Sequence, residues 1–196
     1  MKLVVGLGNP GIEYQFTPHN LGFLTIDRLG ERCQVHIASR RCQAATAKVK
    51  LAGHEVMLAK PETFMNLSGL SVRKLVEDLG LEPASNLIVV YDELDLPFGT
   101  LRIRQRGGTA GHNGLESVVG SLGTDEFVRV RLGIQPEHPV RDGAKFVLGQ
   151  FKKSQLEAVD ELIERGADAV EAILKEGLAA AMNRFNQRPK KDADIE

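Results

Sequence analysis

The sequence has little cysteine, almost no excess charge and no long apolar run. Its two cysteines, Cys33 and Cys42, form neither a CxxC pattern nor a disulfide framework, which fits a reducing compartment and ordinary packing roles. The formal net charge of −1 excludes a whole-protein field that attracts nucleic acid, so any RNA contact must come from a local basic surface. No stretch approaches the roughly 20 apolar residues of a membrane span, and the N-terminus lacks the apolar region of a signal peptide. We therefore expect a cytoplasmic protein that does not contact membranes.

The motifs of covalent catalysis and of zinc binding are also missing. No GxSxG pattern occurs and neither cysteine stands near a histidine in a suggestive motif, so a serine or cysteine nucleophile is unsupported. Asp92, Glu93 and Asp95 form an acidic cluster, but no histidines are spaced beside it as zinc ligands. We expect neither a metal ion nor a cofactor.

Apolar patterns divide the chain into alternating strands and helices. They predict strands at residues 3–7, 44–51, 55–59, 86–91, 100–106 and 127–134. They predict helices at residues 20–32, 64–79 and 178–185, and a short helix that ends near residue 122. A capping box of Ser154 and Glu157 is predicted to open a further, long helix.

The order of these elements favours one fold class. Strands alternate with helices, but some strands pair as hairpins, as at the turn of Gly53 and His54. This predicts a single-domain α/β fold, with a mixed β-sheet and helices packed on both faces. We place the domain at residues 1–187 and expect the charged tail, residues 188–196, to be disordered.

A glycine-rich segment, GLGNPG at residues 6–11, matches the GxGxxG pattern directly after the first predicted strand. A dinucleotide site is disfavoured, because the chain continues as a loop to Pro18 and no acidic residue follows at the end of a second strand to hold a ribose. The turn signal Asn9–Pro10 projects Asn9 away from the sheet. We favour Asn9 as a substrate-facing amide, with a plain tight turn as the alternative.

Other polar residues stand near predicted strand ends and helix starts. Asp92 follows the most apolar strand, where a carboxylate can orient a histidine as in catalytic triads, or simply form a turn. His19 stands just before a helix, where a histidine is more often a cap or a surface residue. His112 lies in GGTAGHNG, whose glycines let the backbone approach a ligand or form a mobile loop. Asn66 opens a helix, where its amide can bind a peptide backbone or only cap the helix.

Arginines alternate along two of the predicted strands. A spacing of two residues places the arginines of each strand on one face of the sheet. In a chain of nearly zero net charge, they indicate a local phosphate-binding surface, with two solvated strand faces as the alternative. The residues are Arg102, Arg104 and Arg106 on one strand, and Arg129 and Arg131 on the other.

Together these stretches resemble the bacterial peptidyl-tRNA hydrolase family. The matching segments, in family order over nearly the whole chain, are VVGLGNPGIEY, PHNLGF, KPETFMNLSG, YDELDLPFG, GGTAGHNGLES and RVRLGI. The resemblance implies a single α/β domain that hydrolyses the ester between a peptide, or an N-blocked amino acid, and the 3′ end of tRNA. The implied partner is peptidyl-tRNA, bound through its CCA end, its peptide and its 5′-phosphate. The implied enzyme is a cytoplasmic monomer that serves translation and ribosome rescue and needs no metal or cofactor.

The resemblance also implies roles for individual residues. His19 matches the catalytic general base, Asp92 the aspartate that orients it, and Asn9 the residue that distinguishes N-blocked from free aminoacyl-tRNA. The positions that match the amides and other side chains of the peptide and tRNA-end cleft are Tyr14, Phe64, Met65, Asn66, His112 and Asn113. The pair that matches the 5′-phosphate site is Arg104 and Arg131.

The chain departs from the family pattern at three positions. Pro18 stands where arginine is frequent, and it restricts Thr17 to an extended backbone. Thr109 and Ala110 stand where glycine is common, which predicts a stiffer loop before Asn113. Two alternatives stay open: a non-catalytic RNA-binding relative of the splicing-factor type, and a nicotinamide oxidoreductase.

Overall fold

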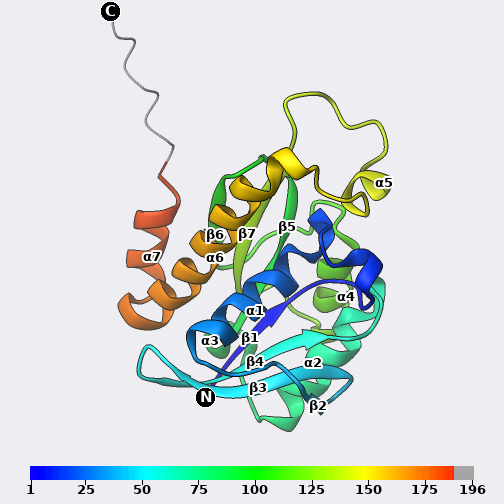
Figure 1. The fold of residues 1–196 in the computed structure, drawn as a ribbon. Helices are drawn as coiled ribbons and strands as arrows, with labels where there is room; N and C mark the ends of the chain where they lie inside the picture. Colours follow the sequence, from blue (N-terminus) through cyan, green and yellow to red (C-terminus); the bar gives the residue numbers. More distant parts are fainter. Residues whose placement is uncertain (188–196) are drawn as a thin grey trace, which may run out of the picture.

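A seven-stranded mixed sheet runs through the centre of the computed structural model, which describes residues 1–187 (Figure 1). Its strands are β1 (Lys2–Gly6), β2 (Ser39–Arg41), β3 (Ala44–Leu51), β4 (His54–Pro61), β5 (Leu87–Pro97), β6 (Leu101–Arg104) and β7 (Val128–Gln135). The spatial order is β2-β3-β4-β1-β5-β7-β6. The central pairs β4–β1, β1–β5 and β5–β7 are parallel, whereas the pairs β2–β3, β3–β4 and β6–β7 are antiparallel. The α/β class with a mixed sheet is therefore confirmed.

Helices cover both faces of this sheet. They are α1 (Leu21–Arg32), α2 (Ser68–Asp78), α3 (Pro83–Asn86), α4 (Asn113–Leu122), α5 (Gly143–Val147), α6 (Leu156–Glu176) and α7 (Leu178–Phe185). The protein has one hydrophobic core on each face of the sheet. Side chains of β1 point to the two faces in turn, so Val4 packs with α1 and α6, whereas Leu3 and Val5 pack with α2 and α4. Among residues 1–187, no helix is both long enough and apolar enough to cross a membrane.

The structure differs from the sequence prediction at several element boundaries. The capping box of Ser154 and Glu157 is wrong: a 3-10 turn (Lys153–Gln155) precedes α6, and the Gln155 side chain accepts a hydrogen bond from the Lys152 N–H. The helix predicted at residues 64–79 begins as a 3-10 turn (Met65–Leu67) before α2. The short elements β2, α3 and α5 were not predicted, because three to five residues are too few to show a period. The tail, residues 188–196, lies outside the described residues, so its disorder stays a prediction.

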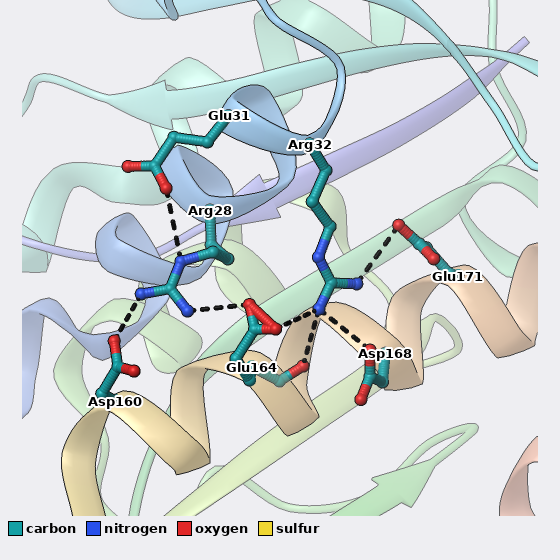
Figure 2. Close-up of polar contacts among 7 residues, drawn as sticks. All are labelled: Arg28, Glu31, Arg32, Asp160, Glu164, Asp168 and Glu171. Atoms are coloured by element: carbon teal, nitrogen blue, oxygen red, sulfur yellow. Dashed lines mark hydrogen bonds and ion pairs between the residues drawn. The ribbon is translucent and has the colours of Figure 1, made fainter. Parts of the chain in front are cut away.

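Helix α1 is fixed against α6 by a network of ion pairs (Figure 2). Arg28 and Arg32 point from α1 toward carboxylates spaced three or four residues apart, and therefore aligned on one face of α6. Their partners on α6 are Asp160 and Glu164 for Arg28, and Glu164, Asp168 and Glu171 for Arg32, at 2.6–3.3 Å. Because Glu164 accepts from both arginines, it is the centre of the network.

The start of α1 also lies in direct backbone contact with the sheet. A Cβ on Gly22 would stand 2.4 Å from the Val90 carbonyl oxygen and 2.5 Å from backbone atoms of Leu7. A Cβ on Gly6 would stand 2.1 Å from the Gly22 carbonyl oxygen. Only glycine allows this approach. The residues just before α1 are thereby held over the carboxyl end of β1, where its parallel pairing with β5 ends at Val90 and where open α/β sheets place their sites.

Candidate active site

Two histidines converge on one buried carboxylate inside β5. Asp92 was expected to follow this strand, but β5 continues to Pro97, and Asp92 pairs with Leu132 of β7 within it. Asp92 is 1% exposed, and its two oxygens lie 2.8 Å from His19 Nδ1 and 2.8 Å from His112 Nε2. His19 comes from the 3-10 turn Pro18–Asn20 before α1, and His112 is the N-cap of α4. The two imidazole centroids are 4.7 Å apart. The structure thus brings together two residues that are 73 positions apart in the sequence, His19 and Asp92.

The hydrogen bonds define the tautomer of both imidazoles. The Leu115 N–H donates to His112 Nδ1 at 3.1 Å, so His112 carries its proton on Nε2 and donates to Asp92. An ionised Asp92 can only accept, so His19 Nδ1 must also donate its proton to the carboxylate. The lone pair of neutral His19 is therefore on Nε2, the nitrogen available to take a proton.

Burial and charge act in opposite directions on this pair. Burial alone would raise the pKa of Asp92, but the charges and hydrogen bonds of His19 and His112 outweigh it and hold that pKa well below its usual range. Burial opposes protonation of His19, but the neighbouring Asp92 anion and its hydrogen bond prevail and raise the pKa of the imidazole. Asp92 is thus an anion throughout the physiological range, and it makes His19 a stronger base.

Asn9 lies in the loop that follows β1, and its amide has a fixed orientation. The Met65 N–H donates to Asn9 Oδ1 at 2.8 Å, so the amide oxygen is engaged. Asn9 Nδ2 has no acceptor among residues 1–187 and remains available as a donor. The side chain is nearly buried and lines a cavity of about 400 Å³ together with Asn20, Phe23 and Lys60.

A second cavity, of about 260 Å³, contains the histidine–aspartate cluster. Its walls include His19, Asp92, His112 and Asn113, with residues of α5 and the preceding turn on the other side. Asn113 is the first residue of α4 and is exposed, so its amide is accessible at this wall.

The other predicted cleft residues lie on the segments around these cavities. Asn66 is exposed on the 3-10 turn before α2 and makes no capping hydrogen bond, which disfavours the capping alternative. Met65 is buried, and a Cβ on Gly114 would stand 2.3 Å from its sulfur, so it packs against the start of α4. Phe64 is 61% exposed. Tyr14 is half-buried in the 3-10 turn Ile12–Tyr14 and lines neither cavity.

The arginines of β6 and β7 share one face of the sheet. Arg102 is opposite Arg131 and Arg104 is opposite Arg129 in the antiparallel register. Directly opposed like charges repel one another, so a bound anion would stabilise this surface. Arg104, Arg129 and Arg131 line a cavity of about 190 Å³ together with Arg106 and the loop that begins at Gly107.

Arg129 was expected at the protein surface, but it is 1% exposed. Its guanidinium donates to the carbonyl oxygens of Gly108, at 2.7 Å, and Asp125, at 2.9 Å. It therefore secures the glycine-rich loop that leads to His112. Ala110 in this loop lines both the arginine cavity and the cavity of the histidine–aspartate cluster.

Sequence analysis missed two residues that shape the site. Arg129 was included only as part of the arginine pattern, and Asn20, whose side chain holds the backbone of Asn9, had no assigned role. Local sequence carries no signal for either contact, because the partners are 21 and 11 residues away.

His19, Asp92 and His112 also have the spacing of metal ligands. Their nitrogen and oxygen atoms lie within 4.8 Å of one another, and in the described part of the chain this is the one cluster with such spacing. Hydrogen bonds account for that spacing.

An anionic carboxylate that holds an imidazole, close to the end of the parallel pairing of β1 with β5, is an arrangement with which a hydrolase can activate water. The model of the peptidyl-tRNA hydrolase family matches residues 3–193. A peptidyl-tRNA hydrolase of Koribacter versatilis is 54% identical over 190 residues, which cover 97% of this chain and 94% of the relative. One of Solibacter usitatus is 52% identical over 188 residues, covering 96% and 95%.

Solved structures agree with this assignment. The crystal structure of peptidyl-tRNA hydrolase from Acinetobacter baumannii superposes with a TM-score of 0.87 at 31% identity, covering 95% of this chain and 94% of that one. The chain therefore belongs to the peptidyl-tRNA hydrolase family, and it is an enzyme. The non-catalytic RNA-binding alternative is not favoured, because the matched relatives are hydrolases.

Proposed function

We propose that this enzyme releases tRNA from peptidyl-tRNA with His19 as the general base on water and Asp92 as its orienting anion. The observation that carries this proposal is the tautomer of the pair. Asp92 engages His19 Nδ1 at 2.8 Å, which leaves Nε2 free to accept a proton. An ester is easier to hydrolyse than an amide, so one base and stabilisation of the oxyanion suffice without a covalent intermediate.

The reaction balances with these groups alone. Water adds to the ester carbonyl carbon while His19 Nε2 takes one of its protons. The tetrahedral intermediate then collapses, the bond to the ribose 3′ oxygen breaks, and the imidazolium returns its proton to that oxygen. The products are a peptide carboxylic acid and tRNA with a free 3′ hydroxyl. Asp92 stabilises the imidazolium in between, which agrees with the raised pKa of His19.

Amide donors provide stabilisation of the oxyanion and recognition of the peptide. Asn9 Oδ1 already accepts from the Met65 N–H, whereas Nδ2 is a free donor, so Asn9 recognises the carbonyl oxygen of the N-acyl group. This supports a role for Asn9 in the selection of N-blocked substrates, which carry a carbonyl that free aminoacyl-tRNA lacks. Asn113 and Asn66, both exposed, bind the peptide backbone and not its side chains.

The tRNA is bound on the flank of this site. Arg104 and Arg131 hold the 5′-phosphate, supported by the arginine cavity that both of them line. The family resemblance supports a cytoplasmic monomer. It also assigns further contacts with the tRNA end and the peptide to Tyr14, Phe64, Met65 and His112.

The direct test is release of free tRNA from purified N-blocked aminoacyl-tRNA. Wild type should turn over repeatedly in a metal-chelating buffer, and the His19→Ala variant should be nearly inactive. The same assay tests the RNA-binding alternative, because such a relative would retain the substrate without hydrolysing it. The oxidoreductase alternative is tested by whether the protein binds NAD.

A further inference from the structure

The side-chain amide of Asn20 forms hydrogen bonds to both the N–H and the carbonyl oxygen of Asn9. Its Oδ1 accepts from the Asn9 N–H at 2.8 Å, and its Nδ2 donates to the Asn9 carbonyl oxygen at 2.9 Å. The residue is 3% exposed, so both bonds are shielded from water. Both polar groups of the Asn9 backbone are thus bonded to one buried side chain, which limits the movement of this residue.

This contact replaces the role that Asn20 would ordinarily have. It occupies the N-cap position of α1, where an asparagine side chain usually accepts from an N–H of the first helical turn. Here it makes no capping hydrogen bond. The amide is directed instead at a loop 11 residues earlier in the sequence.

The two linked segments carry the two parts of the proposed chemistry. Asn20 directly follows His19, and Asn9 supplies the free amide donor. The loop before Asn9 has little freedom, since a Cβ on Gly8 would stand 2.6 Å from the ring of Phe23 in α1. The Asn20 amide is a direct polar connection between the backbone of Asn9 and the segment of His19, while the Met65 N–H holds the Asn9 side-chain oxygen.

We infer that Asn20 is a positioning residue that sets the discrimination between N-blocked and free aminoacyl-tRNA by holding Asn9 at a fixed place relative to His19. This rests on the proposed role of Asn9 as the amide that recognises the acyl carbonyl. Recognition of the N-acyl carbonyl of a blocked substrate needs Asn9 Nδ2 at hydrogen-bond distance while His19 activates water. Free aminoacyl-tRNA has no N-acyl carbonyl, so loss of the Asn20 contact affects blocked substrates more.

The sharpest variant is Asn20→Asp, which changes one NH₂ group into oxygen. The carboxylate still accepts from the Asn9 N–H but repels the Asn9 carbonyl oxygen that the amide had bonded. We expect the ratio of kcat/KM for N-acetyl-aminoacyl-tRNA to kcat/KM for the same free aminoacyl-tRNA to fall about tenfold, as for the loss of one buried hydrogen bond. A purely structural role would lower both rates equally and leave the ratio unchanged.

The chain offers a matched control in Asn186. Its side-chain amide bonds the N–H of Ile103 at 2.7 Å and the carbonyl of Ile103 at 2.9 Å, the same contact at the far edge of the sheet. The Asn186→Asp variant should therefore leave the selectivity ratio unchanged. If Asn20→Asp proves unfolded by circular dichroism, Asn20→Ser, which keeps a small donor and acceptor, takes its place in the same assay.

Variants of Asn9 separate failure of this inference from failure of the proposed function. Asn9→Ala should narrow the ratio, and Asn9→Ala combined with Asn20→Asp should narrow it no further, because both act through one amide. An unchanged ratio in Asn9→Ala would overturn the role of Asn9 itself. A narrowed ratio in Asn9→Ala, with an unchanged ratio in folded Asn20 variants, would overturn the positioning role of Asn20.

Discussion

Replacing the carboxylate of Asp92 by an amide should invert the tautomer of His19. An amide has one acceptor oxygen and one donor group, whereas Asp92 accepts at both oxygens, each at 2.8 Å. His112 must donate, because the Leu115 N–H engages its other nitrogen. In the Asp92→Asn variant the amide oxygen therefore turns to His112 and the NH₂ group faces His19. His19 Nδ1 must then accept, and its proton moves to Nε2, the nitrogen that has to take the proton of water.

The loss of rate should be large. We expect kcat to fall on the order of a thousandfold or more, as when the carboxylate of a catalytic triad becomes an amide. Because Asp92 raises the pKa of His19, its removal lowers that pKa while burial remains. Activity needs neutral His19 and is lost as pH falls through this pKa. The acid limb of the kcat profile should therefore lie above the ordinary value of about 6.5 in wild type and move to lower pH in the variant.

A second substitution tests the tautomer argument itself. Removing the obligatory donor with His112→Ala frees the amide to turn its oxygen toward His19. Asp92→Asn/His112→Ala should therefore be faster than Asp92→Asn alone, although His112→Ala by itself slows the enzyme. The assay is release of tRNA from N-blocked aminoacyl-tRNA across pH, with tRNA affinity measured separately. A double variant slower than Asp92→Asn, or a collapse of tRNA affinity with the rate, would refute this reasoning.

Three further predictions follow from the site and the fold. His19→Ala should stay folded by circular dichroism and lose about 100-fold or more in kcat; near-normal turnover by a verified pure sample would remove His19 from the mechanism. Arg104→Ala should raise KM with little change in kcat, and only on substrates with the 5′-phosphate. The salt dependence of tRNA affinity should become flatter by about one log–log unit or less. Equal losses on substrates without the phosphate would contradict the role of Arg104 in phosphate binding. Glu164→Gln should lower the free energy of unfolding at neutral pH by less than about 1 kcal/mol. Arg28 and Arg32 lower the pKa of this carboxylate, but it is half-exposed and solvent screens the ion pairs. A depressed pKa contributes fully above the unfolded value of about 4.3, and its contribution is lost as pH falls through the lower folded pKa. Chemical denaturation should therefore show the difference shrinking below about pH 4 and vanishing once the folded carboxylate is protonated. A difference that persists in strong acid would exclude the ion pairs as its cause.

The sequence predicts what depends on local pattern and not what depends on distant contacts. The apolar runs predicted the central strands, because a buried strand must be apolar whatever its partners are. The predicted position of Asp92 at a strand end was wrong, because β5 continues to Pro97, and only the family resemblance connected Asp92 with His19. Nothing local indicates that His112 shares the same carboxylate or that Arg129 is buried beneath the glycine-rich loop. The Ser154 capping box failed because a 3-10 turn competed for the same helix start.

The distribution of charge explains how a chain with net charge −1 can bind a polyanion. Many of its carboxylates are already paired, notably those on α6 that face Arg28 and Arg32 in Figure 2. On β6 and β7 the arginines outnumber their partners, with Glu93 as the nearby carboxylate, 3.6 Å from Arg131. The resulting field is short-ranged, since salt screens exposed charges beyond about 10 Å. On the proposed function, this field would therefore act on a phosphate already bound beside the loop that leads to His112 and not on distant tRNA, and selectivity would come from the amides around His19.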